Sequence, residues 1–331
     1  MRGCCSFMCP KREANERTKY NELSKFELPP HVPVKRYRRS AAGTVIDPAD
    51  VRPPSVLRET THYLLSLLPS EMHMSIDLYH FLDDRFRAIR TDLVLQDEAA
   101  DDILQPIARF YLVVQCILLH ETTGRRDVTY ASLRQLLEDQ LHSVLLLLKQ
   151  SSPEFQRYYL LMHVDGPGFA LKLRDNFLHT TDKLTWKEAV WPWFRAASHK
   201  VVMEPHLIHR AILFSRLPVH MEHHLRRLAK AYTKQDQFPV ADVARFLGLP
   251  SIHDATLLCR AFHLDVHDAD SPFVRFNERP IPDVPDADLL AAFMHEEFSR
   301  IDGLREGTSL QDILLHGVDF PSDGEDESVL G

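Results

Sequence analysis

Apolar residues recur at helical spacing through most of this 331-residue chain, and this periodicity limits the possible fold more than any other feature. One stripe follows steps of four, three and four residues, as on one face of an amphipathic helix, and consists of Leu82, Phe86, Ile89 and Leu93. A second stripe of this kind consists of Leu133, Leu137, Leu141, Val144, Leu145 and Leu148. The segment Ile103–His120 is apolar nearly all round, which is typical of a helix buried in the middle of a stack.

Shorter helical patterns follow along the chain, at Phe155–His163, Trp186–Ala197, Leu207–Phe214 and Met221–Tyr232. Successive helices with short connections predict antiparallel pairs stacked into an α-solenoid, which we expect over residues 55–235. The chain has only 11 glycines beside 21 prolines, whereas sheet-rich folds and glycine-cradled nucleotide sites need more glycine. Neither G-x-G-x-x-G nor G-x-x-x-x-G-K-[ST] occurs, so the usual phosphate loops are absent. The prediction is an all-α fold.

The pattern changes near Gln235, and we expect a separate unit over residues 236–283. Pro239 can open a short helix that Gly248 closes, and Ser251 can cap a second helix with Phe262 on its inner side. Apolar and polar residues then alternate on both sides of His267–Pro272, which indicates a hairpin. The order helix, turn, helix, hairpin is typical of a winged helix. Residues 284–331 should form one more helix and an acidic tail.

Charge is distributed unevenly along the chain. Up to Arg58 there are twelve basic and six acidic residues, a balance of +6, and the rest carries −14, which gives the net charge of −8. We therefore treat residues 1–54 as a basic arm, with one expected helix at Glu13–Phe26 that the following prolines end. The arm could contact a polyanion or an acidic partner, or it could lie back on the acidic body.

The basic run Val34–Ser40 contains a single aromatic residue, Tyr37. We expect Tyr37 to anchor the run by burial, and Lys35 and Arg39 to pair with carboxylates of the body. Side chains two apart share a face in an extended segment, so Arg36 and Arg38 should stay free for RNA or an acidic partner.

The expected hairpin carries four apolar residues, which are Val266, Phe273, Val274 and Phe276. Because strand side chains alternate, two of the four should face the core, and the two that face outward should meet another protein. Arg245 and Arg275 could bind RNA weakly and without sequence preference. The second helix of the unit is hardly basic, which argues against reading of a major groove.

The case for catalysis is poor. His220 and His224 lie at i and i+4, but Met221 stands where the zincin pattern needs Glu, and scattered surface histidines explain the set better. The charges within Asp83–Asp92 should form ordinary surface pairs, with flanking arginines keeping the carboxylates ionised. A metal-dependent enzyme that uses the histidines remains the rival hypothesis. We expect no enzyme, no cofactor and no small-molecule substrate.

Five cysteines and no apolar leader predict free thiols in a reducing compartment, the nucleus or the cytosol. Cys5 and Cys9 could ligate zinc, but a structural zinc site needs four ligands and no further Cys or His pair lies nearby in the sequence. We therefore expect these thiols to pack beside the first helix. The most apolar stretch, Phe110–Leu119, is too short to span a bilayer, so no membrane contact is expected.

Four ordered sequence blocks resemble the GANP family, also named for a suppressor of actin. They are Gly3–Glu13 with Arg17, Leu23, Phe26 and Glu27; Val34–Gly43; Arg52-Pro53 with Leu57, Thr60, Tyr63 and Leu64; and Asp84–Leu93 with Gln96. The resemblance covers about residues 3 to 280 and is closest in the first hundred. It is strongest for the short, domain-only animal members that are linked to centrosomes.

The resemblance implies a PCI-like helical stack that ends in a winged helix, acts as a non-catalytic scaffold, and binds a second PCI-type subunit and a small acidic Sem-type peptide. In long members this assembly serves messenger-RNA export at the nuclear pore, but the nucleoporin-like repeats and other extra domains of those members are not found in this sequence. For the short members the implied role is centrosome duplication and spindle organisation. The implied location is the nucleus and cytoplasm, including the centrosome and spindle.

Overall fold

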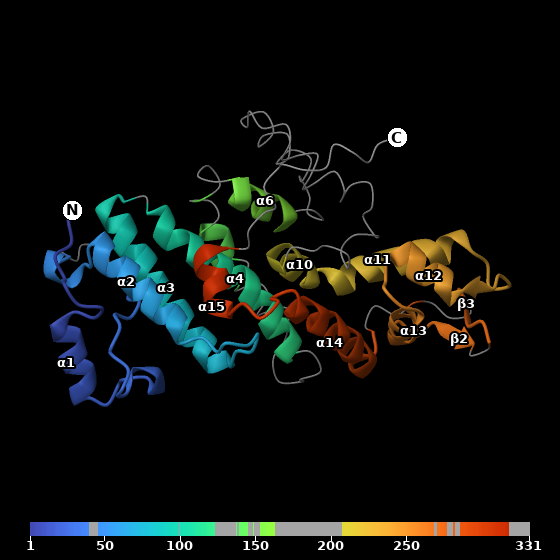
Figure 1. Cartoon of the computed structure of the whole chain (residues 1–331), viewed down its shortest axis with the longest axis horizontal. Coiled ribbons are helices and arrows are strands. Elements are labelled where there is room, and N and C mark those ends of the chain that lie inside the picture. The colour runs from blue at the N-terminus through green and yellow to red at the C-terminus, as the bar shows by residue number, and fades with distance from the viewer. Residues whose placement is uncertain are drawn as a thin grey trace.

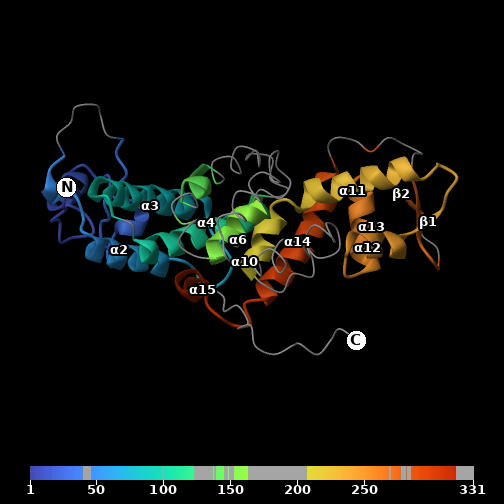
Figure 2. The same cartoon turned by 90° about the horizontal axis from the view of Figure 1, so that it is seen from above.

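The computed structural model is mostly helical, as the periodicity predicts (Figure 1). It describes residues 1–39, 46–98, 100–122, 137, 139–144, 148, 153–162, 207–267, 270–276, 281 and 285–317. The α-helices within these residues include α1 (Lys11–Lys19), α2 (Pro54–Ser66), α3 (Ile76–Gln96), α4 (Asp101–Thr122), α6 (Pro153–Met162), α10 (Leu207–Phe214), α11 (Leu217–Ala231), α12 (Val240–Leu247), α13 (Ile252–Ala261), α14 (Ala287–Gly303) and α15 (Leu310–His316). Short 3-10 helices occupy Lys25–Glu27 and Pro48–Asp50. The molecule is elongated, with α1 at one end and the strands at the other (Figures 1 and 2).

Helix α4 forms the centre of the core. Nearly all of its side chains from Ile103 to Leu119 are buried, as expected for a helix that is apolar all round, and it packs against α2, α3, α10, α14 and α15. The stretch Asp101–Glu121 is long and apolar enough to cross a membrane, contrary to the shorter stretch counted from the sequence. However, 89% of its apolar window is buried inside the protein, and a core helix passes the same test.

The predicted stripes face this core. All four residues of the first stripe are buried on α3. In the second, the four described members are buried, namely Leu137, Leu141, Val144 and Leu148, and the two remaining leucines lie outside the described residues. The patterns predicted at Phe155–His163, Leu207–Phe214 and Met221–Tyr232 correspond to α6, α10 and α11. Trp186–Ala197 and the acidic tail also lie outside the described residues.

A small unit of two helices and three short strands ends the elongated body (Figure 1). Strands β1 (Phe238–Pro239), β2 (Asp265–His267) and β3 (Phe273–Arg275) form an antiparallel sheet in the order β1-β3-β2. Helix α12 ends where predicted, because Gly248 adopts φ 67°, a left-handed conformation that glycine tolerates best. The Ser251 side chain accepts the N–H of Asp254 and caps α13, also as predicted.

The last two helices return to the first half of the chain. Helix α14 packs on α13, α10 and α4, and α15 packs on α4 and α2. Leu310, Ile313 and Leu314 are buried by this contact, and the Arg109 guanidinium of α4 donates to the carbonyl oxygens at the end of α15. The sequence predicted α14 but not α15, which at seven residues is too short to show a helical period.

The first helix is shorter than the predicted Glu13–Phe26. Helix α1 ends at Lys19, and Asn21 takes φ 55°, which breaks the helix before the 3-10 turn at Lys25–Glu27. That turn has a capping box, in which Ser24 and Glu27 each accept a backbone N–H of the other. The expected single helix is therefore wrong, because a capped turn replaces its second half.

Candidate partner-binding surfaces

Carboxylates fix the backbone of the basic arm where it crosses from α1 to α3. The N–H of Val34 donates to Glu27 (2.9 Å), that of Arg36 to Glu13 (2.9 Å), and that of Tyr37 to Asp84 (3.2 Å). The intervening N–H, of Lys35, donates to the carbonyl oxygen of Met8 at 3.0 Å. Four consecutive backbone donors are thus satisfied, three of them by side chains distant in sequence, which holds this part of the arm in one position.

A buried ionic cluster lies beneath the arm. The side chain of Glu27 is fully buried and contacts the guanidinium groups of Arg17 and Arg85, the latter at 3.0 Å. Burial would raise the pKa of Glu27, but the charge of Arg85, the N–H groups of Val34 and Ser24, and the Arg17 bond outweigh it and lower the pKa. This carboxylate therefore stays ionised and is the centre of the cluster.

A second cluster holds the arm to the end of α3. Buried Asp92 accepts from Lys35 at 2.6 Å and from the Arg52 Nε at 2.7 Å. The Gln96 amide donates to the carbonyl oxygens of Arg52 and Asp92, and its Oε1 accepts the N–H of Gly3 at 2.9 Å. The expectation that Lys35 pairs with a body carboxylate is confirmed.

The charges on α3 are largely buried, which contradicts the expected surface pairs. Asp83, Arg85 and Asp92 are all less than a tenth exposed. Asp83 accepts the hydroxyl of Tyr111 at 2.8 Å, and burial raises its pKa despite that bond and the charge of Arg87. The prediction failed because the arm and α4 cover this face of α3, which nearby sequence cannot show.

The remaining arm cations differ from one another. Tyr37 is half-buried with the guanidinium of Arg87 4.2 Å from its ring centre, so it does anchor the arm. Arg36 is exposed and 3.7 Å from Glu22, so it is not wholly free. Arg38 and Arg39 are exposed and form no ion pair with any described residue. The predicted pairing of Arg39 is therefore wrong for the described part of the chain.

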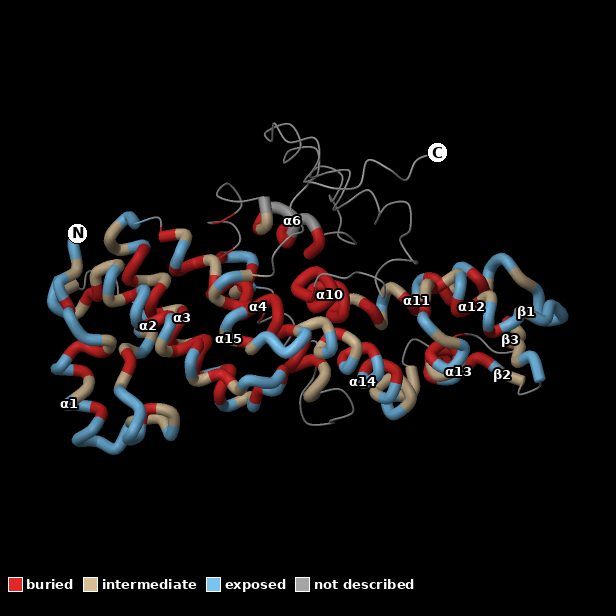
Figure 3. The backbone as a smooth tube through the Cα atoms, in the orientation of Figure 1, coloured by how far each residue is buried: buried red, intermediate tan, exposed pale blue. Residues whose placement is uncertain are grey.

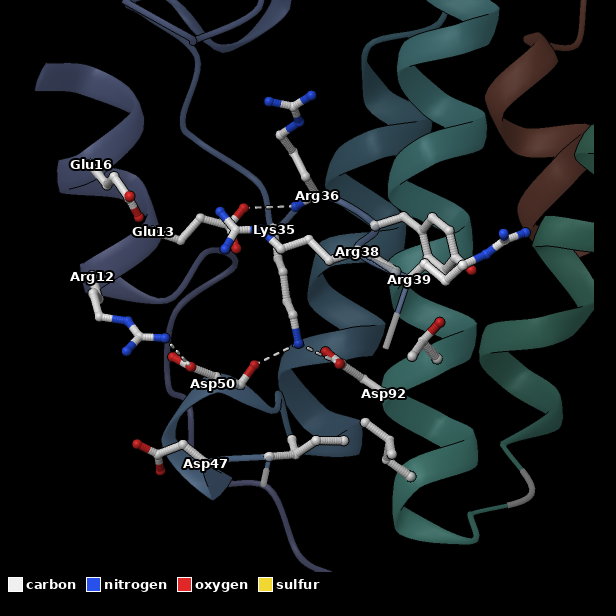
Figure 4. A pocket seen from close by; sticks show the side chains of 15 residues that line it. Arg12, Glu13, Glu16, Lys35, Arg36, Arg38, Arg39, Asp47, Asp50 and Asp92 are labelled. Carbon is white, nitrogen blue, oxygen red and sulfur yellow. Dashed lines mark hydrogen bonds and ion pairs between the residues drawn. The ribbon is translucent and has the colours of Figure 1, made fainter. Parts of the chain in front are cut away.

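A cleft of about 400 Å³ opens beside these cations, between α1, the arm and α3 (Figure 4). Its lining contains five cationic side chains and an equal number of carboxylates. The cations are Arg12, Lys35, Arg36, Arg38 and Arg39, and the carboxylates are Glu13, Glu16, Asp47, Asp50 and Asp92. Figure 4 shows Lys35 pointing down to Asp92 while Arg36 points away from it. A cleft with balanced charge does not select an anion.

The hairpin has two distinct faces. Val266 pairs with Val274, which is fully buried, so both side chains point to the core, and Val266 is half-buried there. Phe273 lies on the other face, where its ring stacks on His267 at 4.7 Å, and Arg275 approaches it at 5.6 Å. Of the two apolar residues predicted for a partner, Phe273 faces outward and Val266 does not.

Arg245, also predicted for RNA, lies on α12. Its side chain is 77% exposed and pairs with Asp242 at 2.9 Å, a surface pair that leaves the guanidinium accessible. The structure does not bring Arg245 together with the arm arginines, since the arm and α12 lie toward opposite ends of the molecule (Figure 1).

Buried ion pairs fix the two-helix unit against the stack. Arg300 of α14 makes two bonds to the buried Asp254 of α13, at 2.9 and 3.0 Å, and also contacts Glu297. Glu297 in turn pairs with Arg210 of α10 at 3.2 Å. Burial raises the pKa of Glu297 against the effect of both arginines. Helices α10, α13 and α14 are therefore joined by one ionic network that sequence reasoning missed.

The five cysteines are free thiols. Cys5 and Cys9 are buried beside α1 as expected, while Cys4 is exposed. Burial, followed by the charge of Glu13, raises the pKa of the Cys9 thiol to about 12, which disfavours the nucleophilic thiolate. Within the described ranges, no three His, Cys, Asp or Glu side chains gather as a metal site.

The profile of the SAC3/GANP family matches residues 8–268, which is more than half of the chain. The chain belongs to the SAC3/GANP family. The matched region runs from just before α1 to β2, so the arm, the ionic clusters and most of the C-terminal unit belong to the SAC3/GANP region, whereas α14 and α15 lie beyond it.

Two relatives carry SAC3 names. The chain is 29% identical to SAC3 family protein B of Arabidopsis thaliana over an alignment of 197 positions, which covers 51% of this chain and 11% of that protein. It is 25% identical to SAC3 family protein 1 of Schizosaccharomyces pombe over an alignment of 310 positions, which covers 80% of this chain and 30% of that protein. The chain thus spans less than a third of either relative.

Membership of the SAC3/GANP family gives the sequence blocks a structural meaning. Arg17 and Glu27 from the first block and Arg85 from the fourth meet in the buried cluster beneath the arm. Asp92, Gln96 and Arg52 meet in the second cluster. The blocks therefore hold the arm of this chain on α3, and the signature is at least in part structural.

Proposed function

We propose that this chain is a non-catalytic, PCI-like scaffold in which the helical stack ends in a winged helix that docks another PCI-type subunit. The observation that carries the proposal is the outward face of the hairpin, at the far end of the elongated body, where Phe273 is stacked on His267 instead of being buried. An aromatic ring with a cation beside it is a typical anchor of a protein interface. Family membership supports the scaffold role.

The proposed partners are a second PCI-type subunit and a small acidic Sem-type peptide. The proposed processes are centrosome duplication and spindle organisation in mitosis, messenger-RNA export, or both, with a location in the nucleus and cytoplasm. The alternative within this class is an RNA-binding subunit of nuclear export or transcription, to which Arg245 and the arm arginines would contribute.

A direct binding experiment tests the proposed interface. The full chain is mixed with a purified PCI subunit, and the complex is measured by size-exclusion chromatography and calorimetry. Phe273→Asp should weaken the complex by at least about tenfold, because truncating a central aromatic anchor costs 2 kcal/mol or more. Ile252→Asp is the matched control, since Ile252 is 46% exposed on α13 of the same unit. Equal losses in both variants would contradict an interface on the hairpin.

Affinity purification from cells with mass spectrometry separates the two cellular roles. Recovery of a PCI subunit with the acidic peptide supports the export assembly, and recovery of centrosomal proteins alone supports the spindle role.

Metal analysis of the purified protein tests the rival hypothesis of an enzyme. Stoichiometric zinc that His220→Ala or His224→Ala removes would overturn the scaffold proposal.

A further inference from the structure

Helix α11 is strongly basic in a chain that is acidic overall. Between residues 216 and 234 there are five Lys or Arg and three His, and the one carboxylate is Glu222. The whole chain carries −8, and the part after Arg58 carries −14, so this local excess of positive charge runs against the charge of its surroundings. In Figure 1 α11 lies between α10 and α12.

One face of α11 presents two of these cations and one histidine to solvent. His223, Arg227 and Lys230 are exposed and lie at i, i+4 and i+7, which places them on one side of a helix. Val219 precedes them by four residues and is 52% exposed. We call these four residues the α11 stripe. The opposite face is buried through residues that include Met221, Leu225 and Leu228.

The cations of the stripe have no acidic partner in the described part of the chain. Glu222, the carboxylate of α11, is already bound by Arg226 at 2.8 Å. Asp236, which follows the helix, instead accepts the N–H and hydroxyl of Thr233. Some other surface cations are paired, as Lys25 is with Asp77 at 2.6 Å. The positive charge of the stripe is therefore left uncompensated within these residues.

We propose that the α11 stripe docks an acidic amphipathic helix of a partner protein. A facing helix that carries carboxylates at the same i, i+4 and i+7 spacing would meet the cations, and an apolar residue at the end of that face would cover Val219. The stripe from Val219 to Lys230 is about 16 Å long, which three turns of a helix match. This surface differs in place and chemistry from the hairpin face proposed above.

A protein partner fits this stripe better than single-stranded nucleic acid. The stripe carries no Phe, Tyr or Trp on which a base could stack, and stacking is a main source of affinity for single strands. The cations also follow a straight helical line that begins with an exposed apolar residue, whereas a phosphate backbone offers nothing for Val219 to bury against.

The test uses the full chain and two labelled synthetic peptides of about 20 residues, long enough to span 30 Å when helical. One peptide has Glu and a terminal Leu on a single helical face, and the other has the same composition in scrambled order. Binding is measured by fluorescence anisotropy at two salt concentrations, with poly(U) RNA as a third probe. The patterned peptide should bind more tightly than the scrambled one.

Four variants decide the outcome. Arg227→Glu with Lys230→Glu should weaken the patterned peptide by about tenfold or more, because like charges then face each other. Arg38→Glu with Arg39→Glu changes the net charge equally on another unpaired, exposed site and should leave affinity within about twofold. Val219→Ala should weaken binding without altering its salt dependence. Circular dichroism shows whether the charge-reversal variant is folded. If it is not, Arg227→Gln with Lys230→Gln repeats the first test by removing the two charges without reversing them.

Three results would overturn the proposal. Equal binding of patterned and scrambled peptides, or equal losses in the two charge-reversal variants, would show a response to net charge alone. A loss of poly(U) binding on reversal of the stripe, with peptide binding unchanged, would assign the stripe to nucleic acid.

Discussion

Single carboxylates decide how the basic arm lies on the body. Glu13, Glu27 and Asp84 each accept a backbone N–H of the arm, so they fix its path without neutralising Arg38 or Arg39. The arm thus combines the two possibilities that the sequence left open: it is docked on the body, and two of its guanidinium groups still face solvent.

Replacement of Glu27 by Gln should destabilise the protein by about 3 kcal/mol at pH 7, because Arg17 and Arg85 would lose their buried counter-charge. The pKa of Glu27 is lower in the folded protein than its ordinary 4.5, so its contribution is present above pH 4.5 and is lost as pH falls through the folded pKa. Urea unfolding of both proteins between pH 3 and 7 measures this difference. A gap that stayed constant down to low pH would contradict the ionic role.

The exposed arginines of the arm permit a separate test for RNA. If the arm neutralises phosphates, log affinity for single-stranded RNA should fall with log salt by about 0.7 for each contact. Arg36→Glu with Arg38→Glu should then weaken binding and flatten that slope. Titration of RNA across salt concentrations measures both, and unchanged values would remove nucleic acid from the arm.

At the scale of helices and strands, periodicity was a reliable guide wherever a helix is long. The stripe on α3, the apolar helix α4, the glycine that ends α12 and the serine that caps α13 were all predicted from local sequence, because each depends on residues within a few turns. The short α15 and the broken α1 were not, because seven residues show no helical period and a capped turn replaces the second half of the expected first helix.

Leu137→Ala and Leu141→Ala should each cost about 2–5 kcal/mol, because each removes a buried side chain and leaves a cavity. Thermal unfolding monitored by circular dichroism measures the loss. Val94→Ala is the control, since Val94 is 69% exposed on α3 and should change stability little. If the two leucine variants melted like the parent, these leucines would not belong to the core.

At the scale of the whole molecule, an ionic network joins the C-terminal unit to the stack. Arg300→Ala should destabilise the protein by about 2 kcal/mol and speed hydrogen exchange in α13, because Asp254 would be left buried without its cation. Arg245→Ala, which breaks an exposed pair of the same unit, is the matched control. Exchange that rose equally in both variants would show that the network does not hold the unit.

Such long-range networks mark the limit of prediction from one sequence. Local patterns identified the helices, the hairpin and the basic arm, and the family resemblance predicted the family that the profile match shows. The sequence patterns did not predict that Asp83 is buried or that Val266 faces the core, because both depend on which face of the helix or strand packs against another element. The α11 stripe is visible in the sequence, because the i, i+4 and i+7 spacing of His223, Arg227 and Lys230 places them on one face of a helix.

The return of the chain's last helices to α2 also affects how the protein is synthesised. The Arg305 guanidinium donates to the carbonyl oxygen of Ser70 at 2.7 Å, across 235 residues. At 5–20 residues per second, a ribosome needs roughly 10 to 50 s to make that interval. Throughout this time the surfaces of α2 and α4 that α15 later covers are exposed on the nascent chain. Their protection in the cell would fall to chaperones that bind apolar surfaces during translation.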